Sequence, residues 1–188
     1  RLNFCGMKRV SGPNTLRRFL WTFRRRVGFI PGDKVVDSEL REGTPGVSDP
    51  LYYLVKAALD ERVPVVSLPG PSAVLVALTV SGLPVNRFVF EGFLPRKKGR
   101  KKLIEELAQE KRTIVLFESP HRIVKTLNEL YQFMGDRKAV LARELTKIHE
   151  EVIRGTLGAL AIKAEEQKLK GEITLVISGV PRDRNRGN

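Results

Sequence analysis

The chain has 188 residues, of which 41% are hydrophobic and 29% are charged, the composition of a folded globular protein and not of a disordered or fibrous one. Its 34 Lys and Arg against 21 Asp and Glu give a formal net charge of +13, which favours an anionic partner, with nucleic acid ahead of a membrane surface or an acidic protein. One cysteine and two histidines exclude an internal disulfide and a Cys/His zinc cage.

Two helices are predicted in the first third of the chain, on either side of a loop rich in glycine and proline. The first, over residues 15–27, is basic and amphipathic, and it either binds phosphates or presents a solvated arginine face. The loop, residues 41–50, ends at Pro50, which suits the first position of the helix predicted over residues 51–62. We interpret the loop as a turn that delivers a helix N-terminus, where polar ligands bind, or as an ordinary connection.

The next segment repeats this arrangement. Residues 63–68 read as a short buried strand, and the rigid loop of residues 69–73 opens a second helix that runs through an apolar stretch to Gly82, a natural stop. Two such loops that each lead into a helix follow the βα pattern of an open sheet, whose ligands bind at the carboxyl ends of the strands.

From there, strands alternate with helices, which indicates the α/β class. Strands are predicted over residues 88–93, 113–117, 139–142 and 172–178. A helix starts near Leu103, another has Ser119 as N-cap with Pro120 at its first position, and a short one has Thr156 as N-cap. Residues 182–188 form a polar tail.

A dense basic block follows the strand of residues 88–93. Six of seven consecutive residues are positive: Arg96, Lys97, Lys98, Arg100, Lys101 and Lys102. Such a block either contacts nucleic-acid phosphates through counterion release or is a solvated loop before a helix.

Five motifs together carry a resemblance to a known family. They are GTPGVSDP (43–50), LPGPSA (68–73), FEGFLP (90–95), FESPHR (117–122) and RELTK (143–147). Their order and spacing resemble the 16S ribosomal RNA cytidine 2′-O-methyltransferases, the RNA-acting branch of the tetrapyrrole methylase superfamily, over residues 44–179. The resemblance implies a two-domain α/β protein that binds S-adenosylmethionine between its domains and acts as a homodimer. It places an N-terminal domain at residues 1–84 and a C-terminal domain at residues 85–181.

The resemblance also implies roles for single residues. It places cofactor contacts on Gly43, Thr44, Val47, Ser72, Ala73, Glu118 and Leu145. The expected reaction is methyl transfer to a ribose 2′-hydroxyl of a cytidine in 16S rRNA of the 30S subunit, with the basic block and Arg122 on the RNA backbone. Glu144 and Lys147 are candidates for the base and for the cation that stabilises the developing alkoxide, or form a structural ion pair. Glu118 and His121 are further catalytic candidates, although Glu118 fits cofactor binding or helix capping equally.

The first 42 residues depart from the family pattern. The buried strand that normally enters the opening loop is absent, Glu42 stands where the family has alanine, and Leu51 stands where it has glycine. Because the chain starts at Arg1 and is short before Gly43, we expect a fragment or processed form whose N-terminal domain is incomplete or rearranged. A C-terminal domain that folds, with weak or absent cofactor binding, is the corresponding hypothesis.

Three other functions stay open at this point. A methylase of the same superfamily could act on a tetrapyrrole or a diphthine precursor, the chain could be a non-catalytic RNA-binding protein with this fold, or it could be a dimerisation module. No apolar run is long enough to span a bilayer, so we expect a cytoplasmic protein with no membrane association. An organellar location is the alternative, because residues 1–32 are rich in Arg and contain no acidic residue.

Overall fold

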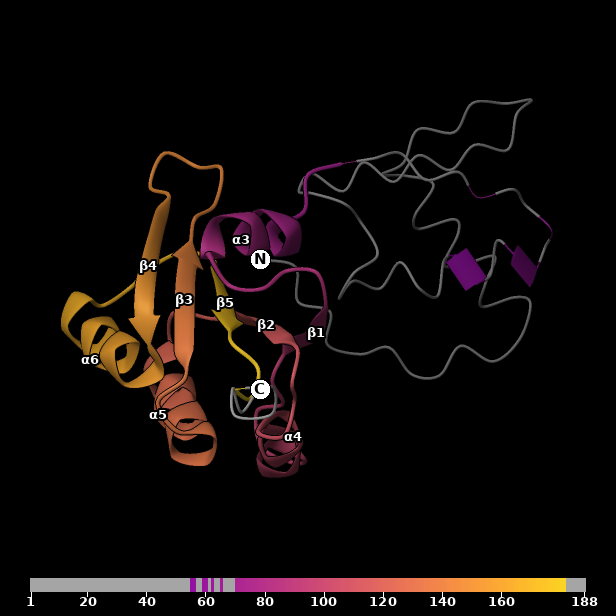
Figure 1. Cartoon of the computed structure of the whole chain (residues 1–188). Coiled ribbons are helices and arrows are strands. Elements are labelled where there is room, and N and C mark those ends of the chain that lie inside the picture. The colour runs from indigo at the N-terminus through magenta and orange to yellow at the C-terminus, as the bar shows by residue number, and fades with distance from the viewer. Residues whose placement is uncertain (1–54, 57–58, 61, 63–64, 66–69, 182–188) are drawn as a thin grey trace, which may run out of the picture. The chain divides into compact units, whose positions relative to one another are not determined.

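A computed structural model describes residues 55–56, 59–60, 62, 65 and 70–181 (Figure 1). The chain divides into two compact units, Arg1–Gly70 and Pro71–Asn188. In the first unit, residues 55–56 and 59–60 are helical, as the helix predicted over 51–62 requires. The strand predicted over 63–68 is not confirmed, since only Val65 is described and it has no regular structure. The helix predicted over 15–27 and the loop 41–50 lie outside the described residues.

The second unit alternates helices and strands, as the sequence predicts (Figure 1). In chain order the described elements are α3 (Ala73–Ser81), β1 (Phe88–Phe93), α4 (Arg100–Leu107), β2 (Thr113–Glu118), α5 (Ile123–Met134), β3 (Lys138–Arg143), β4 (Glu151–Thr156), α6 (Leu157–Gln167) and β5 (Ile173–Ile177). β4 was not predicted from the sequence, and α6, with 11 residues, is longer than the short helix expected there. α3 packs against the strands that follow it and belongs to the second unit, which starts at Pro71. The domain division at residue 84 stays a prediction.

The described strands form one five-stranded mixed sheet in the order β1-β2-β5-β3-β4. β1 and β2 are parallel, whereas β5 is antiparallel to both β2 and β3, so β1, β2 and β3 all point the same way. Ile173 at the start of β5 pairs with Glu118 on one side and Arg143 on the other. The ends of β1, β2 and β3 therefore share one edge of the sheet, here called the carboxyl edge.

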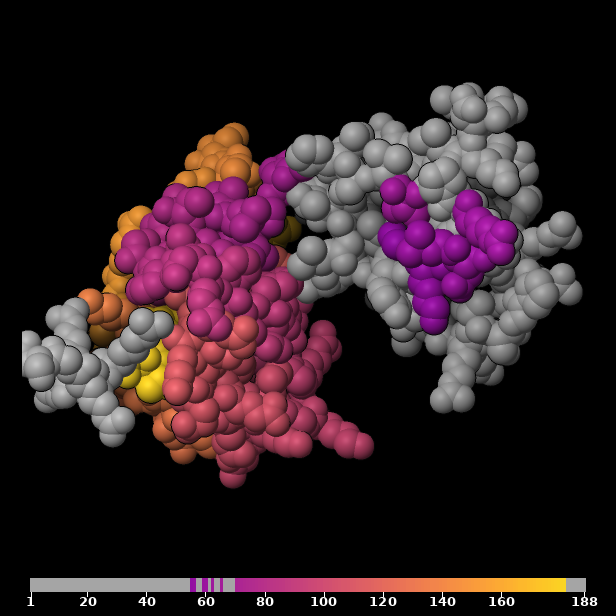
Figure 2. All heavy atoms as spheres, turned by 45° about the vertical axis from the view of Figure 1, so that its right-hand side comes forward, coloured from indigo at the N-terminus to yellow at the C-terminus, as the bar shows by residue number. Residues whose placement is uncertain are grey.

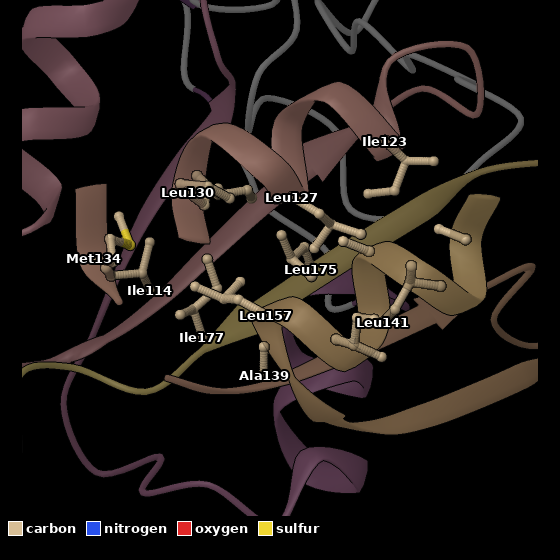
Figure 3. Close-up of a cluster of buried hydrophobic side chains, with 14 of the residues drawn as sticks. Ile114, Ile123, Leu127, Leu130, Met134, Ala139, Leu141, Leu157, Leu175 and Ile177 are labelled. Carbon is tan, nitrogen blue, oxygen red and sulfur yellow. The ribbon is translucent and has the colours of Figure 1, made fainter. Parts of the chain in front are cut away.

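Helices cover both faces of this sheet. α4, α5 and α6 pack on one face and bury a large aliphatic cluster, in which Leu127, Leu157 and Leu175 are fully buried (Figure 3). α3 covers the opposite face, where Val74, Ala77 and Leu78 pack against strand residues. In Figure 2 the side chains of α3 form part of the surface of the unit. Each fully buried leucine contributes about 1.5–3 kcal/mol to folding, so packing in these two layers stabilises the sheet.

Two of the predicted helix boundaries are confirmed and one is wrong. Gly82 ends α3 in the left-handed region (φ 72°), and the Thr156 hydroxyl accepts a hydrogen bond from the Ala159 N–H (3.4 Å) at the start of α6. Ser119 is not the N-cap of α5, which begins at Ile123. The Ser119 carbonyl instead accepts from the Arg122 and Ile123 N–H groups (3.0 and 3.1 Å) and closes a turn. This turn lets the Arg122 side chain reach back to Glu118, a contact described below.

Candidate functional site

The carboxyl edge brings together three of the sequence motifs. β1 runs into the basic block, β2 ends at Glu118, and β3 ends at Arg143, immediately before Glu144 and Lys147. These segments are about 25 residues apart in the chain, and they meet because their strands are parallel in one sheet. Three further predicted cofactor contacts, Gly43, Thr44 and Val47, lie outside the described residues.

Glu118 is a buried carboxylate whose two oxygens are both occupied. Glu118 as a whole is 2% exposed to solvent. Oε1 accepts from the Ser119 N–H (2.8 Å), and Oε2 accepts from the Thr126 hydroxyl (2.7 Å) and from Nη2 of Arg122 (3.1 Å). A carboxylate with this many short bonds inside the protein fixes the end of β2, and its capacity for a ligand hydroxyl is correspondingly small.

Arg100 extends this network to the end of β1. It is 7% exposed, and its guanidinium donates to Oε2 of Glu129 (2.6 Å), to the Thr126 hydroxyl (2.8 Å) and to the Pro95 carbonyl (3.1 Å). Arg122 similarly donates to the Leu94 carbonyl (2.7 Å). We call the five connected side chains the arginine network: Arg100, Glu118, Arg122, Thr126 and Glu129. Two cations assigned to RNA from the sequence, Arg100 and Arg122, thus hold the base of the basic loop.

The rest of the basic block faces solvent. Arg96, Lys97 and Lys98 are exposed and form no ion pair within the part of the chain that the structure describes. Lys101 and Lys102 lie 3.8 Å from Glu105 and Glu106, one helical turn further along α4. Exposed pairs of this kind are weak, on the order of 0.3–0.5 kcal/mol, so both lysines stay available to an anion. The block therefore divides into one structural arginine and five surface cations.

The β3–β4 loop holds the two predicted catalytic residues close to one another. Oε1 of Glu144 accepts from the Glu172 N–H (2.8 Å) and lies 3.7 Å from Nζ of Lys147, which in turn lies 3.1 Å from Oε2 of Glu172. The Glu172 N–H, with Lys147 and Arg143 adding to its effect, holds the pKa of the Glu144 carboxyl below its usual range. Glycine is favoured at position 171 because its φ is +87°, and a Cβ there would also displace the Glu144 side chain, whose Oε1 would lie 2.2 Å away.

The same loop contains two non-glycine residues in the left-handed region, Glu144 (φ 49°) and Thr146 (φ 64°). This conformation is disfavoured for residues with a Cβ and most of all for a β-branched one. The Thr146 N–H is held by Oε2 of Glu150 (2.5 Å), and the Lys147 N–H donates to the Glu144 carbonyl (2.9 Å). Two such residues within three positions therefore give this loop a backbone conformation that its hydrogen bonds maintain against a local conformational cost.

Relieving that strain should stabilise the protein. Asn adopts the left-handed region far more readily than Thr, so we expect Thr146→Asn to raise the free energy of unfolding by about 1 kcal/mol. Urea denaturation measures the change. Thr146→Ala, which keeps a Cβ without the tolerance of Asn, should give a smaller gain, and a loss of stability in Thr146→Asn would contradict the strain.

The start of α3 offers a different kind of group. Ser72 is the N-cap residue, and among the described atoms its hydroxyl makes no cap hydrogen bond, while its carbonyl accepts from the Val76 N–H (2.9 Å). The N–H groups of a first helical turn, including that of Ala73, have no intrahelical partner and attract a carboxylate. Leu145 packs on the same sheet face as α3. Backbone donors and an apolar side chain fit a ligand such as S-adenosylmethionine, which has a carboxylate and an adenine ring.

An open basic hollow next to the β3–β4 loop was not predicted from the sequence. Its volume is about 450 Å³, and it is lined by Arg143, Glu151, Gln167, Lys168, Leu169 and Lys170. Arg143 donates to Glu151 (2.8 Å) and to the Lys170 carbonyl (3.2 Å), which joins β3, β4 and the α6–β5 loop. The only signal in the sequence is the pair of lysines around Leu169, which alone is indistinguishable from a solvated helix end.

His121 is exposed in the turn before α5.

The described residues offer neither a metal site nor a membrane span. Among them, no group of three or more His, Cys, Asp or Glu is arranged to hold a metal ion. No helix in that same part of the chain combines the length and apolar character that crossing a membrane requires.

An α/β unit with polar loops gathered where parallel strands end is typical of proteins that bind a ligand at that edge. The chain belongs to the tetrapyrrole (corrin/porphyrin) methylases, whose family model matches residues 38–161.

The relatives with high identity are ribosomal RNA methyltransferases. The chain is 55% identical over 139 residues to ribosomal RNA small subunit methyltransferase I of Mycobacterium tuberculosis, an alignment that covers 73% of this chain and 48% of that protein. It is 47% identical over 137 residues to the Thermotoga maritima protein of the same name, covering 73% and 62%. The chain thus spans about half to three-fifths of the length of the curated relatives it matches.

Solved structures support the fold. A cobalt-precorrin-4 methyltransferase of cobalamin biosynthesis has a TM-score of 0.57 at 19% identity, with 72% of this chain and 61% of that one covered. The uroporphyrin III C-methyltransferase of Thermus thermophilus has a TM-score of 0.56 at 20% identity, with 88% and 70% covered. The α/β tetrapyrrole methylase fold expected from the motifs is confirmed.

Proposed function

We propose that this protein transfers the methyl group of S-adenosylmethionine to a ribose 2′-hydroxyl of a cytidine in small-subunit ribosomal RNA. One observation carries the proposal. Identity is 55% and 47% with two ribosomal RNA small subunit methyltransferases, against 19% and 20% with tetrapyrrole enzymes of the same fold. The exposed cations beside the carboxyl edge give independent physical support, because an anionic polymer needs such a surface. We further propose that it acts in the cytoplasm on the 30S subunit, as a homodimer.

Residues of the second unit would bind the cofactor through backbone donors and an apolar side chain. When bound, the cofactor supplies an electrophilic sulfonium methyl. The N-terminal turn of α3 at Ser72 and Ala73 would hold its carboxylate, and Leu145 would contact its apolar part. The resemblance of the motifs to the family assigns further cofactor contacts to Gly43, Thr44 and Val47, which lie outside the described residues, and Glu118 would support the end of β2 through the arginine network.

Catalysis in this proposal depends on positioning and on one cation. The acceptor oxygen must lie in line with the methyl group, and no covalent chemistry by the protein is needed. As the 2′-oxygen takes the methyl group and S-adenosylhomocysteine leaves, the hydroxyl proton would pass to solvent water, and Lys147 would stabilise the negative charge that develops on that oxygen. Glu144, whose pKa is lowered, is a poor proton acceptor, so we assign it to orienting Lys147, at 3.7 Å, and not to general-base catalysis.

The test is a methylation assay with two substrates offered side by side. The full chain is incubated with labelled S-adenosylmethionine and either unmodified 30S subunits or a tetrapyrrole. Label in 16S rRNA at a ribose of cytidine, located by nuclease digestion, is the expected result. Label in the tetrapyrrole would overturn the substrate, and salt-dependent RNA binding without label would favour a non-catalytic RNA-binding protein. Light scattering measures whether the chain is a dimer.

The basic block allows a quantitative prediction about RNA binding. Neutralising Lys97 and Lys98 together should reduce the dependence of log affinity on log salt by about 1.4, because each phosphate contact on a single strand contributes ~0.7. Stability should be unchanged, since both side chains are exposed. Fluorescence anisotropy of a labelled RNA across a KCl series measures the slope. Lys111→Met, an exposed lysine outside the block, is the matched control, and an equal effect of that variant would show that the block has no special role.

A further inference from the structure

Aromatic rings on the α3 face of the sheet extend to the carboxyl edge, next to the basic block. Phe90 and Phe117 pack edge to face with ring centroids 4.9 Å apart and contact the buried cluster under α3. Phe93 adds a third ring, 5.7 Å from that of Phe117, and is 56% exposed. Phe93 therefore contacts the packed aromatic pair and leaves more than half of its surface to solvent.

A β-bulge places Phe93 on this face. In a regular strand Phe90 and Gly92 would share a face, and Phe93 would point toward α4 and α5. Here the register with β2 shifts between Phe90 and Gly92, so Phe90 pairs with Val115 and Phe93 pairs with Phe117. Val115 and Phe117 are two residues apart and lie on the same side. Gly92 allows the shift because its φ is +62°, a conformation that favours glycine.

The ring also lies close in the chain to unpaired positive charge. Only Leu94 and Pro95 separate Phe93 from Arg96, Lys97 and Lys98, which are exposed and form no ion pair among the described residues. Hydrogen bonds from Arg122 to the Leu94 carbonyl and from Arg100 to the Pro95 carbonyl hold these two linking residues in place. An aromatic face beside a track of cations is the arrangement by which proteins bind single-stranded nucleic acid, with stacked bases and paired phosphates.

We propose that Phe93 is a stacking platform for an unpaired base of the RNA substrate, with the adjoining phosphates on Arg96, Lys97 and Lys98. The inference rests on the proposed function, since it names how that substrate is held. It assigns a role to a residue that carries no charge and takes no part in the methyl transfer itself. The charge beside the ring favours RNA over a second copy of this basic chain as the occupant.

Binding to a short labelled single-stranded RNA tests the proposal, with full chains carrying Phe93→Ala, Phe93→Leu or Phe93→Trp. Stacking contributes ~1–3 kcal/mol per base, so Phe93→Ala should weaken binding about 5- to 150-fold. Phe93→Leu, which keeps an apolar side chain, should lose nearly as much, and Phe93→Trp should bind at least as tightly as the parent chain. The slope of log affinity against log salt should stay unchanged in all three, unlike in the lysine variants.

A 2-aminopurine base in the RNA gives a direct signal, because stacking on the ring quenches its fluorescence. Loss of quenching in Phe93→Leu but not in Phe93→Trp is expected. Parent-like affinity of Phe93→Leu would overturn the stacking role while leaving RNA binding intact. A change in association state without a change in RNA affinity would assign the ring to a protein interface. If the parent chain binds no RNA under any salt condition, the proposed function itself fails.

Discussion

Replacing Glu118 by Gln is expected to lower the free energy of unfolding by about 3–5 kcal/mol, the cost of breaking a buried, hydrogen-bonded charge pair from one side. The carboxylate accepts from the Ser119 N–H, from the Thr126 hydroxyl and from Arg122, and its side chain is 1% exposed. A carboxamide has one acceptor oxygen in place of two, so it cannot satisfy all three donors. Arg122 also loses its counter-charge.

Urea denaturation, with the slope checked for two-state behaviour, measures this loss. The matched control is Glu105→Gln, which removes the exposed ion pair between Glu105 and Lys101 (3.8 Å). It should lower the free energy of unfolding by no more than about 1 kcal/mol. A cost for Glu118→Gln as small as that of the control would mean that the carboxylate is not a structural anchor, and its assignment to cofactor binding would regain weight.

The second large effect is expected at Arg100, where the conservative change to Lys should cost about 2–3 kcal/mol of stability. Its guanidinium reaches Glu129, Thr126 and the Pro95 carbonyl at once, and one ammonium on a flexible stem cannot reproduce that fork. RNA affinity of the folded protein should change little, since the Arg100 side chain is only 8% exposed.

Lys102→Met is the control for this prediction, because that side chain is 83% exposed and its loss should shift stability by no more than ~0.5 kcal/mol. It should instead weaken RNA binding. The opposite pattern, with RNA binding lost in Arg100→Lys and stability intact, would contradict the division of the block. Glu118→Gln and Arg100→Lys share Thr126, so the double variant should lose less stability than the sum of the two.

Much of the second unit could be predicted from local sequence. Strands β1, β2, β3 and β5 are apolar runs bounded by turn residues, and Gly82 and Thr156 end and begin helices as their types favour. β4 was missed because its sequence, Glu-Val-Ile-Arg-Gly-Thr, mixes charged, apolar and turn-forming residues, and pairing with β3 supplies what local propensity does not. Ser119 is not the N-cap because its carbonyl accepts from the Arg122 and Ile123 N–H groups and closes a turn, so α5 begins only at Ile123.

The sequence by itself determined the family, the α/β class and the motifs that meet at the carboxyl edge, because these depend on residue order and short-range pattern. Only the tertiary structure decided which charges face solvent. In sequence Arg100 and Lys101 are neighbouring cations of the same block, yet one is bonded to α5 and the other is 75% exposed. It also decided that Phe93 faces α3, through a one-residue shift against β2. Both outcomes depend on partners more than 20 residues away, which no local pattern contains.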